Sequence, residues 1–162
     1  MSASANSIAA TILMLAAAGA ARAETQVERG RYLVSIMDCG GCHTTGELGG
    51  HPEPGHTLAG AKIGWAIPGV GIVTPPNLTG DVATGLGNWT SDDIVKLLRT
   101  GVRPDGREIV GPMGWRAYAQ MTDPDIRAVA AYLKSLPPVV HAVPGPTPIA
   151  DFKGAYFTVA HP

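Results

Sequence analysis

Basic charge, aromatic side chains and cysteine are all scarce in this sequence of 162 residues. The 12 Lys and Arg residues are matched by 13 Asp and Glu residues, so the chain lacks the basic excess that would neutralise a phosphate backbone. Nucleic acid is therefore not an expected partner. Aromatic residues make up 6% of the chain, against 21 glycines and 14 prolines, which predicts one domain with long irregular segments around a modest apolar core.

A long apolar run occurs near the N-terminus, at residues 8–21, and is followed by Arg22 and Ala23. The end of this run, Ala-Arg-Ala, has the small-x-small pattern that signal peptidase cleaves, although no Lys or Arg precedes the run. An uncleaved anchor or a buried helix is the alternative, but a bilayer span needs roughly 20 apolar residues. We expect residues 1–23 to be a signal peptide cleaved after Ala23, giving a periplasmic protein with no integral membrane span.

Both cysteines lie in one motif, Cys39-Gly40-Gly41-Cys42-His43. CxxCH is the attachment signal for c-type haem, because two thiols can add to the haem vinyl groups while the adjacent imidazole ligates the iron. The two glycines would let the backbone approach the porphyrin edge closely. The motif predicts one haem c bound covalently through Cys39 and Cys42, with His43 as the proximal iron ligand.

Three other readings of the cysteines compete with haem. A dithiol redox pair would expect a thioredoxin-like context and would leave His43 without a role. A disulfide over so short a loop would constrain the chain little. A zinc site with His51 and His56 has only eight residues between Cys42 and His51, where a finger has about 12–15, and Pro52 and Pro54 oppose a helix carrying both histidines.

Three segments carry the apolar periodicity and caps of helices. Thr90 is an N-cap followed by an acidic residue three positions later, and Gly101 closes that segment. Thr122 caps another segment, which Pro137 ends. The expected helices cover residues 27–37, 90–101 and 122–136.

The remaining chain is rich in glycine and proline. In the long stretch 44–88, alternating apolar positions at Ile63, Trp65 and Ile67 are compatible with a short strand. A loop of this length is usually functional or disordered, and burial against a flat apolar cofactor is a reason for order. We expect a haem-binding domain over residues 24–138 and a Pro-rich tail over 139–162, extended along the domain or against a partner.

A haem iron that only exchanges electrons needs a second axial ligand opposite His43. Met113 is the best placed candidate, because it lies in the segment 111–114, Gly-Pro-Met-Gly, between two expected helices. Met37 is too close to Cys39 in sequence to reach the opposite face. Met121 comes next and His51 or His56 follow; the other candidates in the sequence are His141 and His161.

These motifs resemble a class I cytochrome c, and more narrowly the cytochrome c domains of bacterial dehydrogenases for alcohols, gluconate, and aldehydes or N-heterocycles. Those domains have LAGG-, PNLTPD-, TGIGxW-, PMPWxxY- and AYLRSLPPV-like segments. The similar segments here are residues 58–61, 76–81, 84–89, 112–118 and 131–139, within a resemblance that covers most of residues 28–138.

The resemblance implies an all-α fold, with three main helices around one haem, long loops and room for a short β-hairpin. It implies that the first and last helices cross at Gly30, Tyr32 and Tyr132, and that Met113 is the sixth ligand.

The resemblance also implies that Pro76 or Pro75 offers a carbonyl to the His43 ring, and that Asn77 and Trp89 lie near the haem. At two positions where the family pattern has proline, this sequence has glycine instead, namely Gly80 and Gly114. The second replacement would loosen the loop beside Met113.

The sequence thus predicts a mono-haem cytochrome c that transfers single electrons and is not itself an enzyme, since it shows no paired carboxylates or nucleophile–base set. A thioether ligand raises the reduction potential relative to two imidazoles, which suits an acceptor from a periplasmic dehydrogenase or a subunit of one. A terminal oxidase or another cytochrome would accept the electron. The alternative is a haem enzyme or sensor whose labile sixth ligand gives way to peroxide or a gas.

Overall fold

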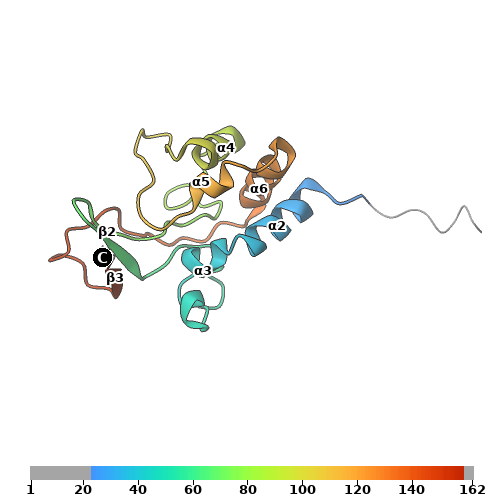
Figure 1. Cartoon of the computed structure of the whole chain (residues 1–162). Helices are drawn as coiled ribbons and strands as arrows, with labels where there is room; N and C mark the ends of the chain where they lie inside the picture. Colours follow the sequence, from blue (N-terminus) through green and yellow to red (C-terminus); the bar gives the residue numbers. More distant parts are fainter. Residues whose placement is uncertain (1–22, 159–162) are drawn as a thin grey trace, which may run out of the picture.

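The computed structural model describes residues 23–158, in which helices pack together at one end and a small sheet lies at the other (Figure 1). The expected signal peptide falls outside the described residues, except for Ala23. Within residues 23–158, no helix has the length and apolar character needed to cross a membrane. The helices are α2 (Gln26–Ile36), α3 (Cys39–His43), α4 (Ser91–Thr100), α5 (Trp115–Tyr118) and α6 (Asp123–Ser135), with a 3₁₀ turn at Glu47–Gly49.

Helices α2 and α6 cross closely at Gly30. A Cβ atom at this position would collide with the carbonyl of Ala128 and the Cβ of Tyr132. The crossing that was expected at Gly30 and Tyr132 is therefore confirmed. Tyr32 does not belong to its centre, because the residue is 51% exposed and its ring lies under the Arg29 guanidinium.

Helices α4 and α6 begin at the threonine caps that the sequence predicts, whereas α2 begins one residue before the expected Val27, after a cap at Thr25 that was not predicted. Thr25, Thr90 and Thr122 cap α2, α4 and α6, and each threonine side chain accepts a backbone N–H from the first turn. Gly101, with φ of 71°, ends α4 in the left-handed conformation. The apolar faces of these helices meet in one core, whose buried leucine, isoleucine and valine members are Leu33, Val34, Leu58, Leu86, Ile94, Leu98, Ile126, Val129 and Leu133.

A three-stranded sheet adds to the helical body, so the expected fold is confirmed for its helices and its short β-hairpin, and the third strand is an addition to it. The hairpin of β1 (Gly64–Ile67) and β2 (Gly71–Val73) accounts for the alternating positions seen in the sequence. The third strand, β3 (Tyr156–Thr158), comes from the C-terminal segment and pairs in parallel with β1. Strands β1 and β3 are about 90 residues apart in sequence, so no local sequence pattern predicts that they pair.

The C-terminal segment lies along the domain as far as the structure describes it. Thr147 exchanges two backbone hydrogen bonds with Ile72, of 2.7 and 2.9 Å, and β3 then joins the sheet. Of the two placements that the sequence allowed, along the domain or against a partner, this is the first. The segment thereby holds the strands and the long loop 44–88 together.

Candidate haem site

The CxxCH motif forms the short helix α3, directly after α2. Asp38 stands between the two helices in the left-handed conformation, with φ of 53°, and its carboxylate accepts the Gly41 N–H at 3.1 Å. This cap starts a new helical turn on which Cys39 and Cys42 are three residues apart. Side chains at that spacing lie on the same face of a helix, as two thiols must to reach one porphyrin edge.

The two glycines of the motif are in different surroundings. A Cβ on Gly41 would collide with the Asp38 carboxylate, so the absence of a side chain there permits the cap. A Cβ on Gly40 would meet nothing nearer than the Thr44 hydroxyl, at 3.8 Å. Space for a close approach from outside the protein is therefore found at Gly40.

The thiols are not those of a reactive dithiol. Burial, and then the nearby Asp38 charge, raise the pKa of Cys39 to about 11 and also raise the pKa of Cys42. Both are free cysteines. Redox-active CxxC pairs need a lowered thiol pKa, so these surroundings oppose the dithiol reading.

His43 is held in a defined orientation. Its residue is 8% exposed, and its Nδ1 lies 2.8 Å from the Pro76 carbonyl oxygen. Because a carbonyl can only accept, Nδ1 carries the proton and donates, which leaves the lone pair of Nε2 for a metal. Burial lowers the pKa of His43 although the Pro76 hydrogen bond opposes that shift, so the ring favours the neutral form that ligates iron. The donor set fits haem c.

Asn77 is buried beside Pro76, with 1% exposure. Its amide group donates to Val139 O at 2.8 Å and to Thr84 Oγ1 at 3.1 Å, and its Oδ1 accepts the Thr79 N–H at 2.9 Å. These bonds engage both polar atoms of the side chain inside the protein. Asn77 thus organises the loop that carries Pro76, while its contact with haem stays a prediction.

Trp89 is half-buried against the helical core, just before α4. The guanidinium of Arg103 lies 5.2 Å from the centre of its ring. This cation–π contact joins Trp89 to the loop that leads from α4 toward Met113. The expected proximity of Trp89 to haem also stays a prediction.

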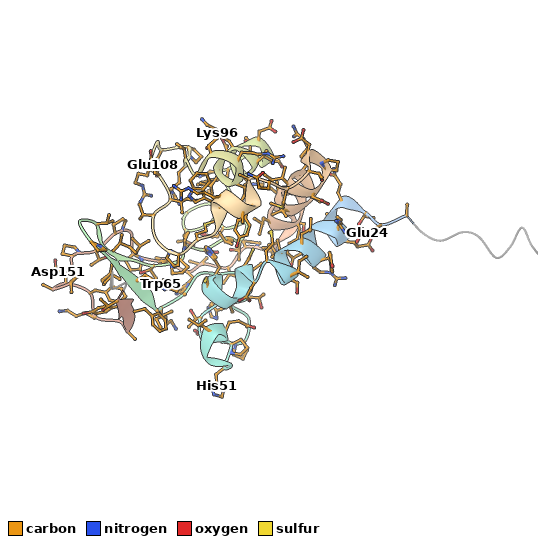
Figure 2. All side chains as sticks on the ribbon, viewed as in Figure 1. Glu24, His51, Trp65, Lys96, Glu108 and Asp151 are labelled. Atoms are coloured by element: carbon orange, nitrogen blue, oxygen red, sulfur yellow. The ribbon has the colours of Figure 1, made fainter. Side chains whose placement is uncertain are left out.

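Met113 lies in the connection between α4 and α5, partly buried and packed against the core. The histidines that compete with Met113 as candidates for the second iron ligand lie in other segments of the chain. His51 is exposed at the far end of the turn after α3, where it points away from the body (Figure 2). His56 and His141 contact each other, with ring centres 5.7 Å apart.

The other candidate ligands are two methionines and one histidine. Met37 is the C-cap of α2, next to the motif. His161 is outside the described residues. Met121 follows α5 and also packs on the core, so it stays the alternative thioether ligand.

Tyr118 is a residue whose importance sequence reasoning missed. It lies on α5, half-buried, and its hydroxyl donates to Met37 O at 3.4 Å. Burial raises the pKa of Tyr118 first, and then the nearby Cys39 and Cys42 raise it further. The side chain thus connects α5 to the end of α2, directly before the CxxCH helix. The PMPWxxY-like segment 112–118 contains this tyrosine and is the sequence signal that points to it.

Comparison with known proteins identifies the family of this chain. The cytochrome c family model matches residues 27–137. The chain is 38% identical over 128 residues to the cytochrome c subunit of a quinone alcohol dehydrogenase of Gluconobacter oxydans, covering 76% of this chain and 25% of that protein. It is 35% identical over 123 residues to the fructose dehydrogenase cytochrome subunit of Gluconobacter japonicus, covering 75% and 23%.

A third relative is the gluconate 2-dehydrogenase cytochrome c subunit of Pantoea cypripedii, 32% identical over 140 residues that cover 80% of this chain and 30% of the relative. The chain thus spans only about a quarter to a third of the length of these relatives. The family match covers more than half of the chain, in the part that contains the CxxCH helix. The protein belongs to the cytochrome c family, whose cofactor is a haem c bound covalently through the cysteines of this motif.

Proposed function

We propose that this domain carries single electrons as the cytochrome partner or subunit of a periplasmic dehydrogenase. The observation that carries the proposal is the CxxCH helix with His43 buried and bonded to the Pro76 carbonyl at 2.8 Å. Relatives named as cytochrome subunits of alcohol, fructose and gluconate dehydrogenases support the donor class. The dehydrogenase would supply the electron, and a terminal oxidase or another cytochrome would accept it.

The haem supplies a one-electron couple at its iron. In our proposal Cys39 and Cys42 would hold the macrocycle, and His43 and Met113 would ligate its iron. The Pro76 carbonyl keeps the His43 ring in one tautomer and orientation. Met113 supplies a weakly donating sulfur, which favours the reduced form relative to a second imidazole.

The remaining parts of the proposal concern location and catalysis. Residues 1–23 would direct export and be removed after Ala23, so the domain would work in the periplasm. Two protein ligands on the iron leave no position for a substrate, and for that reason the domain would relay electrons without breaking bonds.

Stopped-flow reduction of the haem-loaded protein tests this function. We expect a quinone-dependent alcohol, fructose or gluconate dehydrogenase, turning over its own substrate, to reduce the ferric protein, and added imidazole to bind slowly and weakly. The haem enzyme or sensor alternative makes the opposite prediction. It requires fast binding of imidazole, or consumption of added peroxide, and no reduction by any of the three dehydrogenases.

A further inference from the structure

The chain after α6 is bonded to the loop that holds Pro76. Val139 uses both of its backbone groups there: its N–H donates to Thr79 Oγ1 at 3.1 Å, and its carbonyl accepts the Asn77 amide at 2.8 Å. Asn77 and Thr79 are each 1% exposed. Breaking a hydrogen bond between buried groups lowers the stability of the fold more than breaking an exposed one. The buried donor or acceptor that loses its partner cannot form a replacement hydrogen bond with water.

His141 extends the same set of contacts. Its N–H donates to Thr84 Oγ1 at 3.1 Å, and that hydroxyl also accepts from Asn77 at 3.1 Å. The His141 ring donates from Nδ1 to Ala59 O at 2.7 Å. Residues 139–141 are thus bonded to two separate parts of the long loop.

The second of these parts leads back to the CxxCH helix. Gly60 follows Ala59, and its N–H donates to the His43 carbonyl at 2.8 Å. A Cβ on Gly60 would collide with the side chain of Val143 and would press on the backbone of Asn77. Residues 139–143, Gly60 and the Pro76 loop therefore meet at one tightly packed point beside His43.

We propose that residues 139–143 position the Pro76 carbonyl against the His43 ring, and that the C-terminal segment thereby sets the electron-donor strength of this ligand. Thr79, Asn77 and Thr84 act as positioning residues. The inference rests on the proposed ligation of iron by His43 and does not depend on which methionine lies opposite.

The direction of the effect follows from the hydrogen bond. An Nδ1–H bonded to a carbonyl makes the imidazole a stronger donor, and a stronger donor favours ferric iron. A loosened Pro76 loop would weaken this bond. The reduction potential would then rise.

Four single variants of the full chain test the proposal. Thr79→Val removes the hydroxyl that binds Val139 at nearly constant volume, and Thr79→Ser keeps it. Thr84→Val removes the shared acceptor of Asn77 and His141 at a less buried position. Phe157→Ala is the control in the C-terminal segment, since the Phe157 ring contacts the Trp65 ring in a tilted arrangement, with ring centres 5.8 Å apart, and makes none of these bonds.

Four quantities are measured on each haem-loaded variant. They are the reduction potential, the melting temperature, and the chemical shift and solvent exchange rate of the His43 Nδ1 proton by NMR. We expect Thr79→Val and Thr84→Val to shift the redox equilibrium toward ferrous iron by up to about tenfold, which is about 59 mV for one electron. Exchange of the ring proton should become faster in both. Thr79→Ser and Phe157→Ala should keep the wild-type potential, even where Phe157→Ala melts earlier.

The proposal is overturned if both valine variants lower the melting temperature but leave the reduction potential and the His43 Nδ1 proton unchanged. The C-terminal segment would then stabilise the fold without affecting the His43 ligand. If Thr79→Val does not assemble with haem, Thr84→Val decides alone, because Thr84 is only partly buried. The proposed function fails separately, when the wild-type protein itself lacks a histidine-ligated low-spin iron.

Discussion

Gly114 and the ring of Tyr118 are separated by enough space for a side chain: a Cβ on Gly114 would lie 3.8 Å from the Tyr118 ring. The family pattern has proline at this position, beside the proposed ligand Met113. The backbone of Gly114 has φ of −78°, within the range that proline imposes, but its ψ of 37° lies outside the helical and extended regions. Space therefore permits a side chain here, while ψ must shift for proline to fit.

Gly114→Pro should stabilise the protein by less than the gain of about 0.4–1 kcal/mol that proline gives at a position it fits, because φ suits proline but ψ must move away from 37°. It should also slow the displacement of Met113 by added imidazole. Denaturant unfolding and imidazole binding kinetics measure the two effects.

Gly80→Pro is the matched control, since position 80 also carries proline in the family pattern. A Cβ there would lie 2.8 Å from Leu136 O, a contact with backbone that cannot yield cheaply, so this variant should be destabilised. Destabilisation by Gly114→Pro as well would show that the Met113 loop needs glycine.

Gly30→Ala should be severely destabilising, because the methyl group would force α2 away from α6 at the carbonyl of Ala128. Overpacking of this kind typically costs about 1–3 kcal/mol. Urea unfolding gives the value, and Gly145→Ala is the comparison, since a Cβ there has no neighbour within 4 Å. Equal effects of the two substitutions would mean that the α2–α6 crossing is looser than described.

Asp38→Ala should destabilise α3 and reduce the yield of protein with covalently attached haem. The variant loses the cap on the Gly41 N–H, worth about 0.5–2 kcal/mol, and places alanine in a left-handed conformation that costs about 1–2 kcal/mol more. Asp38→Asn keeps an acceptor oxygen and tolerates this conformation, so it should assemble nearly normally. Haem-stained denaturing gels report the yield. A normal yield from Asp38→Ala would show that the Asp38 cap is not needed for haem attachment.

Stability should fall in acid partly through Asp125. Its hydrogen bonds with Arg29, of 2.9 Å, and with Thr122 lower the pKa of this carboxyl in the folded state. The stabilisation is therefore present above the unfolded pKa of about 3.9 and is lost as pH falls through the lower folded value. Asp125→Asn should be less stable than wild type at pH 7, and the difference should shrink below about pH 4. Unfolding midpoints across this range test it, and a constant difference would contradict it.

Features written in short stretches of sequence were predicted well. The Thr90 and Thr122 caps together with apolar periodicity mark α4 and α6, periodicity alone marks α2, and CxxCH marks the haem attachment. The resemblance also led to the Pro76 carbonyl, which does lie at hydrogen-bond distance from His43.

Long-range relationships could not be predicted in the same way. The parallel pairing of β3 with β1 and the bonds of Val139 with Asn77 and Thr79 join residues about 60 to 90 positions apart. No local sequence pattern predicts which distant backbone group will form a hydrogen bond with an asparagine side chain. The sequence did not indicate that Asn77 bonds to Thr79 and Thr84 within its own loop and to Val139 of the C-terminal segment, whereas its expected proximity to haem stays a prediction.

The far-red absorption of the ferric, haem-loaded protein tests the central claim most directly, because a band in that region arises from sulfur of methionine on ferric haem iron. We predict that the wild type shows this band, that Met113→Ala abolishes it and that Met121→Ala leaves it unchanged. A wild-type protein with high-spin iron and no such band, or a band lost only in Met121→Ala, would contradict a His43–Met113 electron carrier.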